Sequence, residues 1–388
     1  MIRNWLLPEY IEDVLPTEAA RVEQLRRNLL DLFKVHGYQY VIPPMMEYME
    51  SLTAGIGHDL DLATFKVVDQ LTGKLMGIRA DMTPQTARID AHMLDNQGVT
   101  RLCYAGSVLR TTPDGLARSR EPLHVGAELY GHADIESDIE IQRLMVKALH
   151  AVGLGTLYID ISHVGIFDSL VEGVELDETL EQELYAALQS KDQAAVRELG
   201  RSLSQDILAA LCALTELNGD VSVLDEAVRR LPQTARIQHA LNDLRAIGAS
   251  LADLDVKVCF DLAELRGYHY HSGVVFAAYA QGYAGPLARG GRYDEVGAIF
   301  GRARPATGFS LDLRGVVSSL PVVEMTNAIF APSMGDALLD ETIESLRSQG
   351  HIVIQDLPGQ ESHRAELGCD RMLVQQNGEW VVIAAPEL

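Results

Sequence analysis

A long helical block between two strand-rich stretches constrains the fold of this chain most. From about 167 to 251, apolar residues recur at helical spacing, as in LEQELYAALQ and DILAALCALTEL, without a fixed repeat. Short apolar or alternating runs, bounded by Gly, Pro and polar residues, predict strands on both sides of this block. We therefore expect an α+β fold with mostly antiparallel strands, helices on one face and a helical insertion.

The pattern changes again at Pro321, which begins a linker. Beyond it, apolar runs and a helical stretch alternate at short spacing, which predicts a small α/β unit of its own. We expect one domain over 1–320, interrupted by the insertion at about 167–251, and a second domain over 326–388.

Local signals place the elements around the insertion. Apolar spacing predicts a helix over 17–35 with Thr17 as its N-cap, and another over 82–94 that Thr83-Pro84 opens. Gly290 and Gly291 predict a tight turn before a helix near 294–299. Strands are expected at 39–42, 101–109, 124–130, 157–162, 256–262, 273–280 and 307–313, and a hairpin with its turn at 70–74.

The charge of the chain argues against a nucleic-acid partner. Acidic residues outnumber basic ones 55 to 32, which gives a net charge of −23. A polyanion such as tRNA is held by Lys and Arg contacts to its phosphates, and a negative field opposes it. The four cysteines are far apart and predict reduced thiols, and no stretch is apolar enough to cross a membrane. We expect a cytoplasmic protein that binds neither tRNA nor a membrane.

Two motifs in the second strand-rich stretch are specific. The segment 265–276 reads LRGYHYHSGVVF, and 289–294 reads RGGRYD. They resemble the two histidine-specific signatures of histidyl-tRNA synthetase, a class II aminoacyl-tRNA synthetase, and the resemblance covers roughly residues 5–320. It implies the antiparallel sheet with flanking helices of that class. The strand ending in Pro43-Pro44 resembles the first class-defining motif, which implies a homodimer.

The resemblance also implies an amino-acid pocket. In IRADMTPQTAR, Asp81 and Thr83 match residues that hold the ammonium group of histidine, although Asp and Thr are also expected as caps at a helix start. Arg110 matches the arginine that binds the α-phosphate and the substrate carboxylate, and Glu128 matches a carboxylate lining the pocket. The expected set of ligand-binding residues therefore begins with these four.

Two further pocket residues come from the histidine-specific motifs. Arg266 matches the arginine that assists carboxylate activation, and Tyr293 matches a pocket tyrosine above Gly290-Gly291. His269 and His271 stand where the family has aspartate and tyrosine. A His-x-His pair on a strand can bind zinc, but no third ligand has a sensible spacing, so we expect no metal site and no cofactor.

The positions that would hold ATP depart from the family. Thr112 replaces the glutamate that reads the adenine amino group. In TGFSLDLRGV, Asp312 and Gly315 stand at the glycine and arginine of the last class-defining motif, and Arg314 comes one residue early. One residue rotates a helical side chain by about 100°, and the Asp312 carboxylate would repel a triphosphate. We therefore expect no catalytic residues and no synthetase-like binding of ATP.

A synthetase body without nucleotide contacts resembles the regulatory subunits of ATP phosphoribosyltransferase. In that family the subunit binds a short-form catalytic subunit in a hetero-octamer, is needed for full activity in the first step of histidine biosynthesis, and confers feedback inhibition by histidine. The resemblance implies that partner and histidine as a possible effector. Two other interpretations stay open, namely a histidyl-tRNA synthetase-like enzyme that activates an amino acid with ATP, and an amino-acid sensor that contacts another protein.

Overall fold

A nine-stranded sheet of order β1-β5-β6-β12-β11-β10-β7-β9-β8 forms the centre of the larger part of the chain. Its neighbours are antiparallel except for the parallel pairs β1/β5 and β7/β9. The α+β expectation is confirmed. The strands are β1 Gln39–Tyr40, β5 Thr100–Ser107, β6 Leu123–Tyr130, β7 Leu157–His163, β8 Asn218–Gly219, β9 Val256–Asp261, β10 Val274–Ala280, β11 Ala288–Arg292 and β12 Ala306–Asp312.

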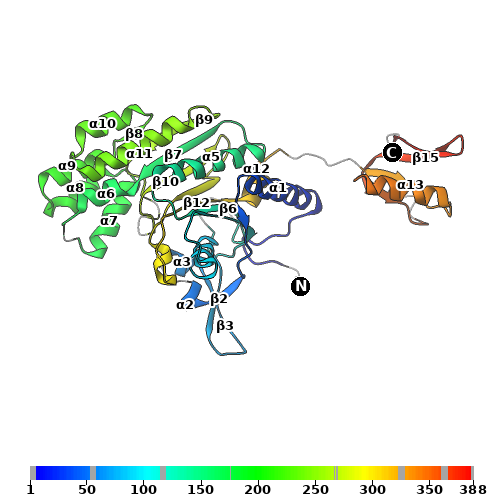
Figure 1. Cartoon of the computed structure of the whole chain (residues 1–388), viewed down its shortest axis with the longest axis horizontal. Coiled ribbons are helices and arrows are strands. Elements are labelled where there is room, and N and C mark those ends of the chain that lie inside the picture. The colour runs from blue at the N-terminus through cyan, green and yellow to red at the C-terminus, as the bar shows by residue number, and fades with distance from the viewer. Residues whose placement is uncertain are drawn as a thin grey trace. The chain divides into compact units, whose positions relative to one another are not determined.

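The computed structural model divides the chain into two compact units, 1–320 and 321–388 (Figure 1). Arg266 and His269 lie outside the described residues. The structure describes residues 6–52, 58–113, 119–174, 176–265, 267, 270–321, 328–359 and 366–385.

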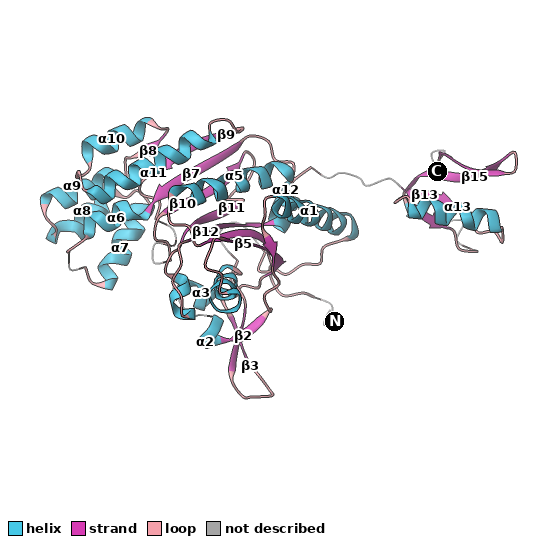
Figure 2. Ribbon diagram, in the orientation of Figure 1, coloured by secondary structure: helices cyan, strands magenta, loops and turns pink. Residues whose placement is uncertain are grey.

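Long helices cover one face of the sheet (Figure 2). The alternation of side chains along β6 shows why: Val125, Ala127 and Leu129 enter the hydrophobic core beneath these helices, whereas Glu128 points to the opposite face. This alternation leaves the opposite face of the sheet for polar side chains such as Glu128. The covering helices are α1 Pro16–Val35, α5 Ile135–Ala151, α11 Ala235–Leu251 and α12 Leu313–Ser319.

The helical insertion is confirmed, and it also contributes β8 to the edge of the sheet. Its helices begin at side chains that accept hydrogen bonds from free backbone N–H groups, such as Asp177, Asp192, Ser204 and Thr234. Its apolar faces join the main core. The remaining elements are α6 Val164–Val171, α7 Glu178–Gln189, α8 Gln193–Leu199, the 3-10 helix η2 Gly200–Ser202, α9 Gln205–Leu214 and α10 Ser222–Arg230.

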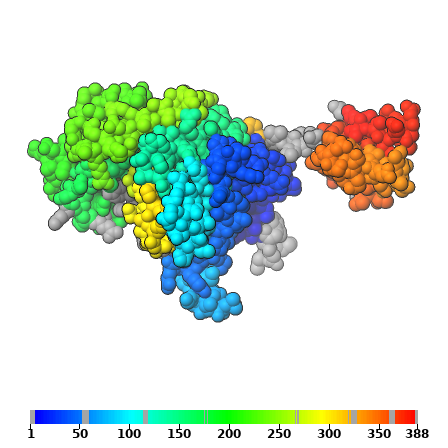
Figure 3. Space-filling model, viewed as in Figure 1, coloured from blue at the N-terminus to red at the C-terminus, as the bar shows by residue number. Residues whose placement is uncertain are grey.

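The predicted hairpin projects from the body (Figure 3). Its turn is held by Asp69, which accepts hydrogen bonds from the Leu71 amide at 3.1 Å and from the Thr72 hydroxyl at 2.6 Å. A three-stranded sheet of order β2-β4-β3 results. Its strands are β2 Met46–Tyr48, β3 Phe65–Val68 and β4 Leu75–Ile78, and the short helices α2 Met49–Leu52 and α3 His58–Ala63 lie between β2 and β3 in the chain.

The predicted helix over 82–94 has two parts. The α-helix α4, Thr83–Arg88, has Pro84 in its first turn, and the π-helix η1, Ile89–Leu94, continues it. Asp90 on η1 is buried and forms an ion pair with buried Arg304, with 2.7 Å between Oδ1 and Nη1. This pair ties η1 to the segment that leads into β12.

Two local predictions were wrong. Thr17 does not cap α1, because Leu15 occupies the cap position and Pro16 starts the helix. Gly290 and Gly291 form no turn, since both lie inside β11. They are needed there for space: a Cβ on Gly290 would lie 2.1 Å from the Gly308 carbonyl oxygen. The helix expected near 294–299 is the 3-10 helix η3, Val296–Phe300.

Residues 328–385 form a small α/β unit around a four-stranded sheet of order β14-β13-β15-β16. Helix α13, Ala337–Ser348, packs Leu339 and Ile343 against Ile329 and Leu373. No described helix in either unit is long and apolar enough to span a bilayer. The strands are β13 Ala328–Ala331, β14 Ile352–Gln355, β15 Cys369–Gln376 and β16 Glu379–Ala384.

Candidate functional site

A cavity of about 1060 Å³ opens on the face of the nine-stranded sheet that the long helices leave free. Five of the six expected ligand-binding residues line it, namely Asp81, Thr83, Arg110, Glu128 and Tyr293. They come from the segment before α4 and its first residue, the loop after β5, β6 and the segment after β11, so the fold gathers residues that are up to 212 positions apart (293 − 81).

The floor of the cavity is one carboxyl group beside two glycines. Glu128 on β6 is in register with Gly308 on β12, and Gly308 is in register with Gly291 on β11. A Cβ on Gly308 would lie 1.5 Å from Glu128 Oε2, so only glycine leaves room for this side chain. The glycines of the two strands thus determine where Glu128 lies.

A network of hydroxyl groups surrounds Glu128. Tyr104 donates to Oε1 at 3.0 Å, and Tyr293 donates to Oε2 at 2.5 Å. The Thr83 hydroxyl lies 3.3 Å from that of Tyr104. Burial raises the pKa of Glu128 to about 8, although the hydrogen bonds from Tyr293 and Tyr104 act in the opposite direction. Burial therefore shifts Glu128 toward its neutral form.

Aromatic rings form one wall next to Glu128. Tyr270 stacks on Tyr293 with 5.2 Å between ring centroids, and Tyr130 meets the Tyr293 ring edge-on at 6.4 Å. His271 lies beside them, and its Nδ1 is 3.2 Å from the Arg292 carbonyl oxygen. Burial lowers the pKa of His271 to about 4, so this ring is neutral. Among the described residues, no metal-ligand cluster includes His271.

Charged and titratable groups also line the cavity. Asp81 accepts a hydrogen bond from the Thr83 amide at 2.7 Å, so it also stabilises the start of α4. Arg110 donates from Nε to the Ala80 carbonyl at 3.3 Å. His124, in register with Asp312, lines the cavity and is 5% exposed. Its Nδ1 has no hydrogen-bond partner among the described residues.

Sequence reasoning missed His124 and Tyr104. Burial lowers the pKa of His124, while the carboxylate of Asp81 acts in the opposite direction. Strand alternation was the available signal, because His124 and Glu128 are four residues apart on β6 and face the same side. Tyr104 gave no such signal, since its hydroxyl reaches Glu128 only across Gly126, the residue with which Tyr104 is paired.

The end of the cavity near α12 is occupied by internal contacts. Asp312 caps α12 and accepts hydrogen bonds from the amides of Arg314 and Leu123, both at 3.1 Å. The Arg314 guanidinium donates to the carbonyls of Glu121 and Glu12, also at 3.1 Å. The two residues that departed from the ATP-binding pattern are therefore engaged by the fold itself.

An N-terminal segment borders this same end. Tyr10, Ile11 and Glu12 line the cavity. The Tyr10 carbonyl accepts from the Arg120 amide at 2.9 Å, and Tyr10 adopts a φ of 63°, which is uncommon for a residue with a side chain. Thr112 lines a smaller adjacent cavity of about 470 Å³ and offers no carboxylate.

Two family models divide the chain between them. "Histidyl-tRNA synthetase" matches residues 10–316, and "ATP phosphoribosyltransferase subunit HisZ C-terminal domain" matches residues 326–383. Among solved structures, an ATP phosphoribosyltransferase regulatory subunit/histidyl-tRNA synthetase from Bacillus halodurans is similar at a TM-score of 0.83 and 28% identity, over 96% of this chain and 98% of that one. Histidyl-tRNA synthetase from Nostoc shares the fold at a TM-score of 0.78 and 20% identity, over 98% of this chain and 97% of that one.

Curated relatives match along their whole length. An ATP phosphoribosyltransferase regulatory subunit from Methylobacillus flagellatus is 83% identical over 100% of both chains. One from Cupriavidus pinatubonensis is 53% identical over 98% of this chain and 99% of its own. With a synthetase body, a second unit of the matching kind and relatives this similar, the chain belongs to the family of ATP phosphoribosyltransferase regulatory subunits.

Proposed function

We propose that this chain is the non-catalytic partner of a short-form ATP phosphoribosyltransferase catalytic subunit, in the first step of histidine biosynthesis in the cytoplasm. It activates that subunit and makes it sensitive to histidine. The observation that carries the proposal is the contrast between the two ends of the cavity. One end keeps free space among Asp81, Thr83, Glu128 and Tyr293, and the other is held by Asp312 and Arg314.

The open end suits an amino acid with a polar side chain. The Asp81 carboxylate and Thr83 hydroxyl are acceptors for an ammonium group, and the Arg110 guanidinium is a donor for a carboxylate. Glu128 and the tyrosine hydroxyls offer both donors and acceptors for an imidazole. We propose histidine as the ligand of this pocket.

The other end argues against amino-acid activation. Activation needs cations aimed at the phosphates of ATP. Arg314 instead donates to two backbone carbonyls, and the Asp312 carboxylate lies among the cavity residues next to it. A triphosphate would meet negative charge where the family places a glycine, and Gly315 offers no cation where the family places an arginine.

The assembly that we propose is a hetero-octamer of four subunits of each kind, in which this chain forms synthetase-like homodimers. The names of the curated relatives support the partner. Exposed apolar residues next to the predicted dimer motif, Tyr40, Ile42, Met46 and Tyr48, support the dimer. Histidine regulates the assembly if it binds two states of the complex unequally.

Mixing this chain with a short-form catalytic subunit tests the proposal. We expect a higher rate of phosphoribosyl transfer, a larger mass by size-exclusion chromatography, and inhibition by histidine. The catalytic subunit alone is the control. If neither the rate nor the mass changed, the proposal would be contradicted. The remaining interpretation would be an amino-acid sensor that contacts another protein.

Calorimetry tests the pocket separately. Asp81→Asn removes one negative charge but keeps an oxygen for the Thr83 amide, so we expect weaker histidine binding by the isolated chain. The matched control is Asp253→Asn, at an exposed carboxylate that pairs with Arg143 far from the cavity residues. Identical isotherms for the two variants would show that histidine does not bind in this pocket.

An exchange assay tests the alternative of an ATP-using enzyme. We expect no histidine-dependent exchange between ATP and pyrophosphate, because Asp312 places a carboxylate at the nucleotide end and Arg314 donates to backbone carbonyls instead of phosphates. Exchange above a protein-free control would make the chain a synthetase-like enzyme.

A further inference from the structure

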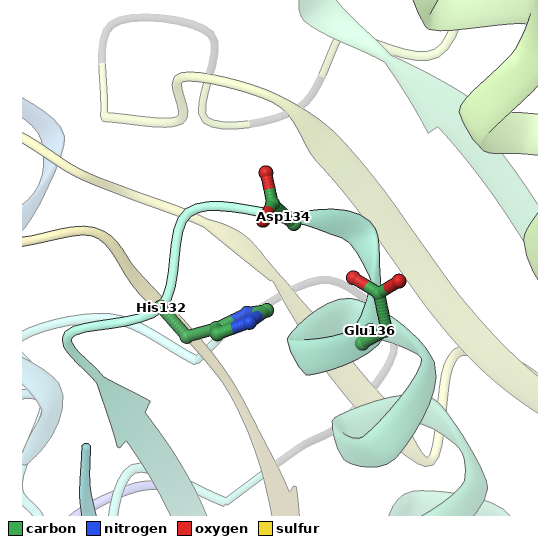
Figure 4. Close-up of side chains that lie close together, drawn as sticks. All are labelled: His132, Asp134 and Glu136. Atoms are coloured by element: carbon green, nitrogen blue, oxygen red, sulfur yellow. The ribbon is translucent and has the colours of Figure 1, made fainter.

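Three side chains outside the cavity gather at the start of α5. His132 and Asp134 lie on the connection from β6, and Glu136 is in the first turn of the helix (Figure 4). Their potential ligand atoms, one imidazole nitrogen and two carboxylate oxygens, all lie within 4.8 Å of one another. Carboxylates alone are ordinary at a helix start, because they interact favourably with the helix dipole.

The fold makes no other use of the three side chains. Asp134 is at the N-cap position of α5, but its side chain forms no capping hydrogen bond. The His132 Nδ1 is buried without a hydrogen-bond partner among the described residues. Among the described residues, no ion pair includes the carboxylate of Asp134 or Glu136.

The backbone beneath the three side chains is held rigidly. Arg292 donates to the carbonyls of His132 at 3.3 Å and Asp134 at 3.4 Å. The Ser137 hydroxyl donates to the same carbonyl of Asp134 at 2.9 Å. These bonds restrain the backbone at His132 and Asp134, and Glu136 lies in the first turn of α5, which lowers the entropic cost of binding.

The same arginine cannot neutralise the cluster. Its guanidinium contacts the Asp138 carboxylate at 2.6 Å and the Asp294 carboxylate at 3.3 Å. Asp138 and Asp294 already compensate its single charge. The Arg292 guanidinium therefore does not balance the negative charge of Asp134 and Glu136.

We propose that His132, Asp134 and Glu136 bind a divalent transition-metal cation, with Zn²⁺ the best match and water in the remaining position. One imidazole and two carboxylates are a donor set for Zn²⁺, whose ligand atoms lie about 2.0–2.2 Å from the ion and so roughly 3.3–3.6 Å apart in a tetrahedral site. Binding requires the exposed Asp134 and Glu136 side chains to rotate, so that the ligand atoms, which lie within 4.8 Å of one another, reach that range.

Calorimetric titration of Zn²⁺ into the untagged, EDTA-treated full chain tests this site. We expect one ion per chain, and a loss of affinity of about tenfold or more in His132→Gln and in Glu136→Gln, since even outer-shell partners of a metal contribute 10- to 100-fold. Asp340→Asn, in the first turn of α13, and His351→Gln, at an exposed histidine, are the matched controls and should bind as the parent does.

A second readout guards against loss of folding. Circular dichroism should show the same melting curve for all variants without metal. Co²⁺ should give visible absorption bands in the parent and the controls but not in His132→Gln. The proposal is overturned if the parent takes up no ion, or if both ligand variants bind Zn²⁺ as tightly as the parent.

Discussion

At the scale of single residues, Glu128 determines the character of the pocket. The residue is 1% exposed, and its carboxyl group receives hydrogen bonds from two tyrosines. Burial outweighs these bonds, so the neutral form is favoured. The ligand that enters thus meets a group that both donates and accepts hydrogen bonds, instead of a fixed negative charge.

This state of Glu128 makes stability depend on pH. The pKa rises from 4.5 to about 8 on folding, so the folded chain binds the proton more tightly. The stabilisation is fully present below pH 4.5 and is lost as pH rises through about 8. We expect the free energy of unfolding to fall between pH 5 and pH 8, by at most about 1.4 kcal/mol per pH unit from this group.

Urea denaturation of Glu128→Gln checks that prediction. The difference between parent and variant isolates the contribution of Glu128, and it should change with pH. Glu183→Gln, at an exposed position on α7, is the control and should show the slope of the parent. A pH-independent difference between parent and Glu128→Gln would contradict the raised pKa.

At the scale of elements, the close register of β6, β12 and β11 sets the space for Glu128. Gly308→Ala would place a methyl group 1.5 Å from Glu128 Oε2, so the carboxyl or the strand must move. We expect a loss of about 1–3 kcal/mol in stability, as for other overpacked sites, and weaker histidine binding. Gly155→Ala, where no atom lies within 4 Å, should change neither quantity in thermal unfolding or calorimetry.

The π-helix η1 depends on one buried ion pair. Asp90→Ala would leave the Arg304 guanidinium, itself 6% exposed, without its carboxylate. Breaking a buried pair from one side costs about 3–5 kcal/mol, so we expect a large drop in the denaturation midpoint. Asp253→Ala breaks the exposed pair with Arg143 and should have little effect. Equal effects of the two substitutions would show that burial of the pair is unimportant.

Periodicity predicted most elements, because apolar spacing records burial directly. The helix α1 and the insertion followed from it, whereas the hairpin was predicted from its turn residues at 70–74. β11 was missed because Gly290 and Gly291 suggest a turn when only the local sequence is considered. Glycine is needed at both positions because neighbouring strands approach closely. A local stretch of sequence does not reveal that approach. His132 was missed for the same reason, because the connection from β6 to α5 brings it beside Asp134 and Glu136.

At the scale of the whole molecule, the pocket belongs to one unit. Every residue that lines the large cavity lies between Tyr10 and Ser318, inside the unit 1–320. The second unit has its own sheet and its own small core. The proposed binding of histidine therefore requires lining residues from the synthetase-like body alone.

The fragment 1–320 tests this requirement. Because it keeps every lining residue and its own core, we expect it to fold and to bind histidine with the affinity of the full chain, measured by calorimetry after circular dichroism has confirmed its helix content. The fragment with Asp81→Asn provides the matched control and should bind more weakly. If the folded fragment lost histidine binding while the full chain kept it, the second unit would have to contribute to the site, and the pocket could not be understood from the synthetase-like body alone.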